Sequence, residues 1–163
     1  MAVNRLIILA GVLAIVALGI SIYNAWRSSG HQKEKHLAVM SLERMQRDTE
    51  HFGDHTVAFT YMGEGEYRLE TQGLEDAGSA GSLAYNAMVA LDISNIEQKT
   101  DLDKFTIYGY QDGELIFEVY YTFGILPRVT FHGRFEGVEY KPDFNGASVD
   151  PGLNPVTIRA GNA

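Results

Sequence analysis

The sequence contains no cysteine and only four prolines in 163 residues. Without cysteine the chain can form no disulfide, no thiolate metal site and no cysteine nucleophile. Basic residues are also scarce, since 13 Lys and Arg stand against 21 Asp and Glu. Residues 56–163 hold sixteen acidic and seven basic side chains, whereas residues 1–55 hold five acidic and six basic ones. An acidic body of this kind argues against nucleic acid as a partner.

The longest uncharged segment is an apolar run near the start of the chain, Leu6–Tyr23, with the sequence LIILAGVLAIVALGISIY. As an α-helix this run would rise about 27 Å, close to the hydrocarbon thickness of a bilayer. It therefore predicts a transmembrane anchor within residues 1–27. Arg5 marks one membrane interface, and Tyr23, Trp26 and Arg27 mark the other.

Small side chains gather on one face of this predicted helix. Stripes of this kind let neighbouring helices approach closely in lipid, which predicts a docking face for other transmembrane helices. The alternative is that Ala and Gly are simply common in membrane helices. The face consists of Ala10, Ala14, Ala17 and Ser21, with Gly11 alongside.

Two signals disagree on the side of the membrane that would carry the body of the protein. Arg27, Lys33 and Lys35 after the apolar run favour a cytoplasmic body by the positive-inside rule. The short basic segment before the run is instead typical of an export signal that was not removed. We expect a single-pass membrane protein whose β domain is periplasmic or external rather than cytoplasmic.

Residues 28–55 predict a linker followed by a short amphipathic helix. Ser28-Ser29-Gly30 is a break, and Gly53 is a plausible stop for the helix. Between these signals the apolar residues step by four and three, as on one face of a helix. This stripe contains Ala38, Leu42, Met45, Thr49 and Phe52.

Residues 56–163 predict a β domain, because short β-like segments alternate with turn signals. The clearest hairpin turn is Gln111-Asp112-Gly113. We expect a flexible stretch over residues 72–82 and a strand or short helix over 83–93. The fold class is therefore mainly β, a β-sandwich or small barrel of about seven or eight antiparallel strands. The predicted strands are 56–62, 66–71, 104–110, 114–123, 128–132, 137–141 and 156–159.

No reaction motif emerges from the polar residues. His51 and His55 are four apart, but Gly53 breaks the helix between them. The loop from Asp143 to Asp150 is rich in oxygen ligands but lacks the EF-hand order. The surroundings of Ser79 do not form the G-x-S-x-G motif of a serine hydrolase. We expect no catalytic residue, no metal site and no cofactor, and hence no enzyme.

These features favour a non-catalytic accessory subunit of a larger membrane complex. It would dock its helix against other transmembrane subunits in the bilayer, and its β domain would cover one side and stabilise the assembly. Respiratory and photosynthetic energy-converting complexes are analogies for such an assembly, and pigments or lipids are further candidate contacts of the helix. Tyr residues that are exposed would form a contact surface. A membrane-anchored enzyme or binding domain is one alternative.

A filament subunit is the other alternative. The layout of an apolar helix, an amphipathic continuation and a β domain resembles that of type IV pilins and pseudopilins. That family has a Gly cleavage site before the apolar run and a Glu five residues into the mature chain. Here no Gly precedes Leu6, no acidic residue lies within Leu6–Tyr23, and Ser28-Ser29-Gly30 interrupts the helix.

Overall fold

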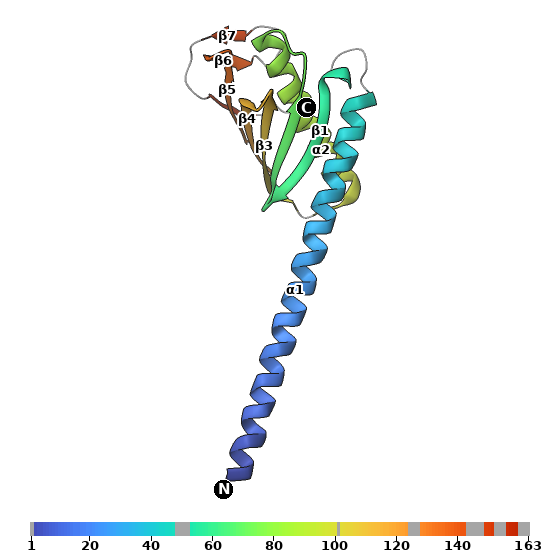
Figure 1. Cartoon of the computed structure of the whole chain (residues 1–163), viewed down its shortest axis with the longest axis vertical. Helices are drawn as coiled ribbons and strands as arrows, with labels where there is room; N and C mark the ends of the chain where they lie inside the picture. The colour runs from blue at the N-terminus through green and yellow to red at the C-terminus, as the bar shows by residue number, and fades with distance from the viewer. Residues whose placement is uncertain are drawn as a thin grey trace. The chain divides into compact units, whose positions relative to one another are not determined.

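A computed structural model describes the backbone of residues 2–47, 53–100, 102–123, 128–142, 149–151 and 156–159. It describes side chains for residues 13–47, 53–100, 102–123 and 128–141. The chain divides into two compact units, Met1–Lys33 and Glu34–Ala163. Helix α1, Ala2–Arg47, contributes residues to both units (Figure 1).

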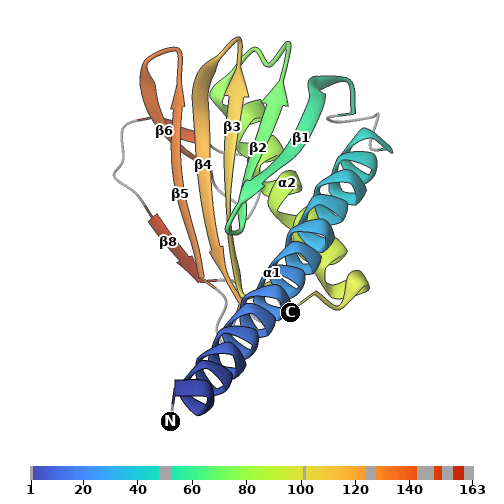
Figure 2. The ribbon, with the colours of Figure 1, turned by 60° about the horizontal axis from the view of Figure 1, so that its bottom comes forward.

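The second unit is built on a single mixed β-sheet with the strand order β1-β2-β3-β4-β5-β6-β7, in which β8 pairs with β5 (Figure 2). Neighbouring strands are antiparallel except β2 and β3, which are parallel. Parallel neighbours need a crossover connection, and helix α2, Ala77–Gln98, supplies it. A short 3₁₀ helix, Gly53–His55, precedes β1. The strands are β1 Thr56–Gly63, β2 Glu66–Thr71, β3 Lys104–Gln111, β4 Glu114–Thr122, β5 Arg128–Phe135, β6 Val138–Pro142, β7 Val149–Pro151 and β8 Val156–Arg159.

The predicted sandwich or barrel of antiparallel strands is wrong, although most strands lie close to the predicted segments. The difference comes from residues 77–98, which form a helix on one face of the sheet (Figure 2). Asp76 starts this helix, because its carboxylate accepts a hydrogen bond from the Ser79 backbone N–H at 2.7 Å. Lys99 ends it in the left-handed conformation, with φ 48°.

The hairpin predicted at Gln111-Asp112-Gly113 is confirmed. Strands β3 and β4 pair across it, and the two central turn residues have positive φ, 53° at Asp112 and 84° at Gly113. Two positive values in succession match the twist of the flanking strands, which explains the preference for Asp-Gly.

Helix α1 runs without interruption through Ser28-Ser29-Gly30, so the predicted break is wrong. Within the second unit, Leu37, Ala38, Ser41 and Met45 are buried, and the Ser41 Oγ lies 3.3 Å from the Ser94 Oγ of α2. Both hydroxyls also donate to carbonyls of their own helices, so the two helices meet through small, internally satisfied side chains. The predicted stripe residues Thr49 and Phe52 lie outside the described residues.

The helix-covered face of the sheet contains a row in which glycine and aromatic residues alternate across four strands. Gly109 pairs with Phe117, Phe117 with Gly133, and Gly133 with Tyr140. The Phe117 ring covers Gly109, and the Tyr140 ring covers Gly133. The rings of Phe117 and Tyr140 are almost fully buried. Cross-strand rings therefore fill the space that missing side chains leave.

The predicted membrane anchor is contradicted. In the part of the chain that the structure describes, no helix has an apolar stretch of the length that a membrane crossing needs. The predictions of a single-pass membrane localisation, a bilayer partner and a periplasmic or external domain lose their basis with it.

Candidate functional site

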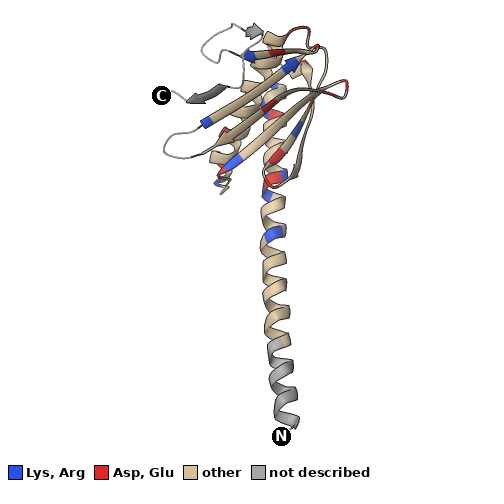
Figure 3. Cartoon of the chain, turned by 90° about the vertical axis from the view of Figure 1, so that its left-hand side faces the viewer, with Lys and Arg blue, Asp and Glu red and all other residues tan. Residues whose placement is uncertain are grey.

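The most exposed apolar surface of the described chain lies on α1, at residues 13–26, here called the apolar segment. Its large side chains are between 52% and 74% exposed, and together they cover more than half of the helix circumference. Figure 3 shows that it carries no Lys, Arg, Asp or Glu. A helix that is apolar all round is normally enclosed by other structure. The large residues are Leu13, Ile15, Val16, Leu18, Ile20, Ile22, Tyr23 and Trp26.

The predicted docking residues are only partly within the described side chains. Ala14, Ala17 and Ser21 are exposed and share one face of α1. The Ser21 hydroxyl donates to the Ala17 carbonyl at 2.9 Å, so its polar group is satisfied within the helix. This leaves a smooth, effectively apolar strip of small side chains. Ala10 and Gly11 belong to α1, but their side chains lie outside the described residues.

Of the four residues predicted to mark the membrane interfaces, three have side chains that the structure describes. Tyr23, Trp26 and Arg27 are exposed on α1. The side chain of Arg5 lies outside the described residues. Trp26 is the sole tryptophan of the chain and is 74% exposed, which makes it a natural reporter of any partner that covers the segment.

A second candidate surface is the sheet face opposite the helices. Tyr108, Tyr110 and Tyr120 lie on it and are partly or fully exposed. The guanidinium of Arg68 stacks on the Tyr110 ring, 4.0 Å from its centroid, and pairs with Glu70. Aromatic rings that are ordered in this way lose little conformational freedom on contact, so the face could support protein binding.

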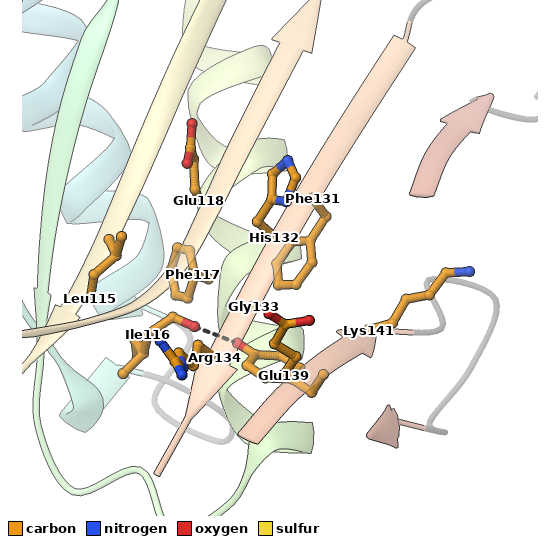
Figure 4. Close-up of a pocket in the computed structure, with 11 residues that line it drawn as sticks. Leu115, Ile116, Phe117, Glu118, Phe131, His132, Gly133, Arg134, Glu139 and Lys141 are labelled. Atoms are coloured by element: carbon orange, nitrogen blue, oxygen red, sulfur yellow. Dashed lines mark hydrogen bonds between the residues drawn. The ribbon is translucent and has the colours of Figure 1, made fainter. Parts of the chain in front are cut away.

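A hollow of about 390 Å³ opens on this face between β4, β5 and β6 (Figure 4). Its origin is an irregularity in β4, where Ile116 and Phe117 are both buried although they are consecutive. The next outward side chains, Leu115 and Glu118, are thereby separated by two residues instead of one, which leaves a gap. The Ile116 carbonyl, displaced from the ladder, accepts a hydrogen bond from the Tyr140 hydroxyl at 3.1 Å.

The charged rim of the hollow is close to balanced. Strand register places Glu118 opposite His132, and Arg134 opposite Glu139. Lys141 lies at the far side and pairs in register with Asp150 of β7. The Arg134 side chain donates a hydrogen bond from its Nε to the Gly137 carbonyl at 3.4 Å. Among the described residues, no group of three His, Asp or Glu could hold a metal ion.

The sequence gives no local sign that His132 has partners, because Glu118 and Lys141, which also line the hollow, are 14 residues earlier and 9 residues later along the chain. Only the pairing of β4 with β5 brings Glu118 beside it. No local pattern could have found this constellation.

One polar cluster ties α1 to the sheet at the start of the second unit. The Glu34 carboxylate accepts a hydrogen bond from the Gly65 backbone N–H at 3.2 Å and another from the Tyr61 hydroxyl. Burial, with the hydrogen bond and negative charge of Glu34, raises the pKa of Tyr61 to about 12. Burial likewise raises the pKa of Tyr67, which lies fully inaccessible beside them. The cluster is structural, since both phenols stay protonated near neutral pH.

No protein-family model, no curated protein and no solved structure matches this chain. A function has to be argued from the two exposed surfaces themselves.

Proposed function

We propose that this chain is a non-catalytic subunit of a larger protein assembly, in which the apolar segment of α1 packs among helices of other subunits. The observation that carries the proposal is the exposure of large apolar side chains over more than half of the helix circumference at residues 13–26, beside the strip of small side chains. Covering such a surface removes apolar area from water, at about 25 cal/mol for each Å². One neighbouring helix could cover one side only, so several neighbours are required.

The small-residue strip indicates where the closest neighbour lies. Ala14, Ala17 and Ser21 present little bulk. A partner helix can approach the α1 backbone more closely there than on the side that carries Ile15 and Val16.

The test compares two substitutions that add the same number of carbon atoms on different sides of α1. Ala14→Leu places bulk on the small-residue strip, and Ile15→Phe places it on the bulky side. Ala14→Leu should lower the fraction of chain that migrates with the assembly in native electrophoresis by about tenfold, because close packing has no room for the added atoms. Ile15→Phe should leave that fraction nearly unchanged.

Trp26 provides an independent readout. Its fluorescence emission should be shifted to the blue in the wild-type assembly and should return to the red in Ala14→Leu, as the indole becomes solvated. Equal assembly of both variants, or a solvent-exposed Trp26 in the native assembly, would refute packed insertion of the apolar segment.

A filament built from copies of this chain is the second candidate. It is favoured by the uninterrupted course of α1 through Ser28-Ser29-Gly30, which removes one departure from the pilin-like layout. The absence of a Gly before Leu6 and of an acidic residue within Leu6–Tyr23 still departs from that family. Electron microscopy of the purified assembly separates the candidates: long polymers of one polypeptide support the filament, and a discrete particle with several polypeptides supports the subunit.

A further inference from the structure

The sheet face opposite the helices already holds one guanidinium group, and this group shows what the face can bind. Arg68 of β2 lies over the Tyr110 ring of β3, with its Cζ 4.0 Å from the ring centroid. Its Nε donates to the carboxylate of Glu70, which lies opposite Tyr110 in the parallel register. An aromatic ring and a carboxylate therefore act together on one cation.

A second ring on the same face has two carboxylates beside it. Tyr108 precedes Tyr110 by two residues on β3, so both side chains lie on one face of the sheet. Glu118 is its cross-strand neighbour on β4, and its hydroxyl donates to the Glu66 carboxylate of β2. Burial, together with the negative charges of Glu66 and Glu118, raises the pKa of Tyr108. Two negative charges therefore meet at this ring.

No cation of the chain balances these two carboxylates. Within the part of the chain whose side chains are described, no ion pair involves Glu66 or Glu118. The guanidinium of Arg68 is already engaged on the neighbouring ring, and His132 lies opposite Glu118 without forming an ion pair. Glu66 is exposed and Glu118 is partly exposed, so a cation from another molecule can reach them.

The surroundings of Tyr108 favour a protein partner over a small molecule. Tyr120, two residues beyond Glu118 on β4, is 40% exposed, and Tyr108 and Tyr110 are partly exposed. These three rings spread over two strands and do not line the hollow. Small-molecule sites are concave, whereas tyrosine rings on an open surface are typical of protein interfaces.

We infer that the open face around Tyr108 binds a segment of a partner protein through an Arg side chain, which stacks on the Tyr108 ring and pairs with Glu66 and Glu118. Arg is preferred to Lys because its planar guanidinium can stack on a ring and bond to carboxylates at the same time. A second copy of this chain is disfavoured as the partner, because each copy carries a net charge of −8. The site contains no residue of the apolar segment, so the inference does not depend on the proposed assembly.

The experiment measures binding of a fluorescein-labelled peptide, Gly-Thr-Arg-Tyr-Arg-Thr-Gly, to the full chain by fluorescence anisotropy. A matched peptide has citrulline in place of both Arg residues, which keeps the shape of the side chains but removes their charge. It should bind about tenfold more weakly, because it loses both the ion pairs and the cation–π contact.

Variants of the chain locate the site. Glu118→Gln should weaken binding of the Arg peptide by about fivefold, since it removes one carboxylate without changing the size of the side chain. Glu75→Gln removes the same charge from the exposed loop before α2 and should leave binding unchanged. Tyr108→Phe keeps the ring and should bind as wild type does, whereas Tyr108→Leu should bind about threefold more weakly.

Four outcomes would overturn the inference. The first is no anisotropy change with the Arg peptide up to about 1 mM, the range of the weakest useful affinities. The second is equal binding of the Arg and citrulline peptides, since recognition would then not depend on the cation. The third is equal weakening by Glu118→Gln and Glu75→Gln, which would reduce the effect to net charge. The fourth is a wild-type dimer in light scattering that Glu118→Gln converts to a monomer, since a second copy would then occupy the face.

Discussion

Replacing Gly109 by Ala probes the alternating glycine–aromatic row in the core. A Cβ built at Gly109 would lie 2.3 to 2.5 Å from three ring atoms of Phe117. Ordinary contact between carbon atoms begins near 3.5 Å, so the ring would have to retreat by about 1 Å. Phe117 is 1% exposed and stacks on Phe131 with ring centroids 6.4 Å apart, which leaves it little space to move.

Two opposing terms set the size of the effect. Overpacking a core of this kind costs about 1–3 kcal/mol. The methyl group also restricts the unfolded chain, which stabilises the protein by about 0.4–1 kcal/mol. The expected net loss in the free energy of unfolding is therefore about 1.3 kcal/mol, or about 4 °C in the unfolding midpoint for a chain of this size.

Urea denaturation followed by circular dichroism would measure this loss. The decisive control is a double-mutant cycle with Phe117→Leu, which removes ring atoms that the new Cβ would strike. The double variant should be more stable than the sum of the single effects by about 1 kcal/mol. Additive effects, or a loss below about 0.5 kcal/mol for Gly109→Ala, would show that the ring is free to move and would refute the packing argument.

Two further predictions concern Tyr140, which is buried, and Tyr61, which is partly buried. Tyr140→Phe should lower the free energy of unfolding by about 1–2 kcal/mol, because the buried Ile116 carbonyl loses its 3.1 Å donor; an unchanged thermal midpoint would contradict this. The pKa of Tyr61 is raised from 10.0 to about 12, so the folded state holds this proton more tightly than the unfolded state. The contribution of Tyr61 to the free energy of unfolding should be intact below about pH 10 and should be lost as the pH rises toward 12. Urea unfolding across this range should show a steeper decline in wild type than in Tyr61→Phe, and parallel declines would count against the assignment.

The strands could be predicted because their signals are local. Alternation of apolar and polar residues and the Asp112-Gly113 turn depend on neighbours within a few positions. Helix α2 was predicted only in part, as a strand or short helix over 83–93, because Gly78 and Gly81 resemble a flexible linker and hide its first turns. A signal was nevertheless present, since Asp76 is a good N-cap and Leu83, Ala87 and Leu91 recur at helical spacing.

The candidate surfaces likewise have some features that are local in the sequence and others that depend on strand pairing. The uncharged character of residues 13–26 and of β1 can be read directly from composition, whereas β7 lies in a stretch that the sequence predicts as a loop. That β1 lies at an edge, and that Glu118 lies beside His132, depends on which strands pair.

By itself the sequence determined where the chain is extended, where it turns, and which segments lack charge, because backbone preference and side-chain periodicity act over a few residues. The tertiary structure alone decided that residues 77–98 cross over as a helix, that β2 and β3 are parallel, and that the Tyr140 hydroxyl reaches the Ile116 carbonyl. Strand order depends on a balance between the apolar surface that an arrangement buries and the entropy that is lost when its long loops close. That balance is a sum over the whole chain, so no short stretch of sequence contains it.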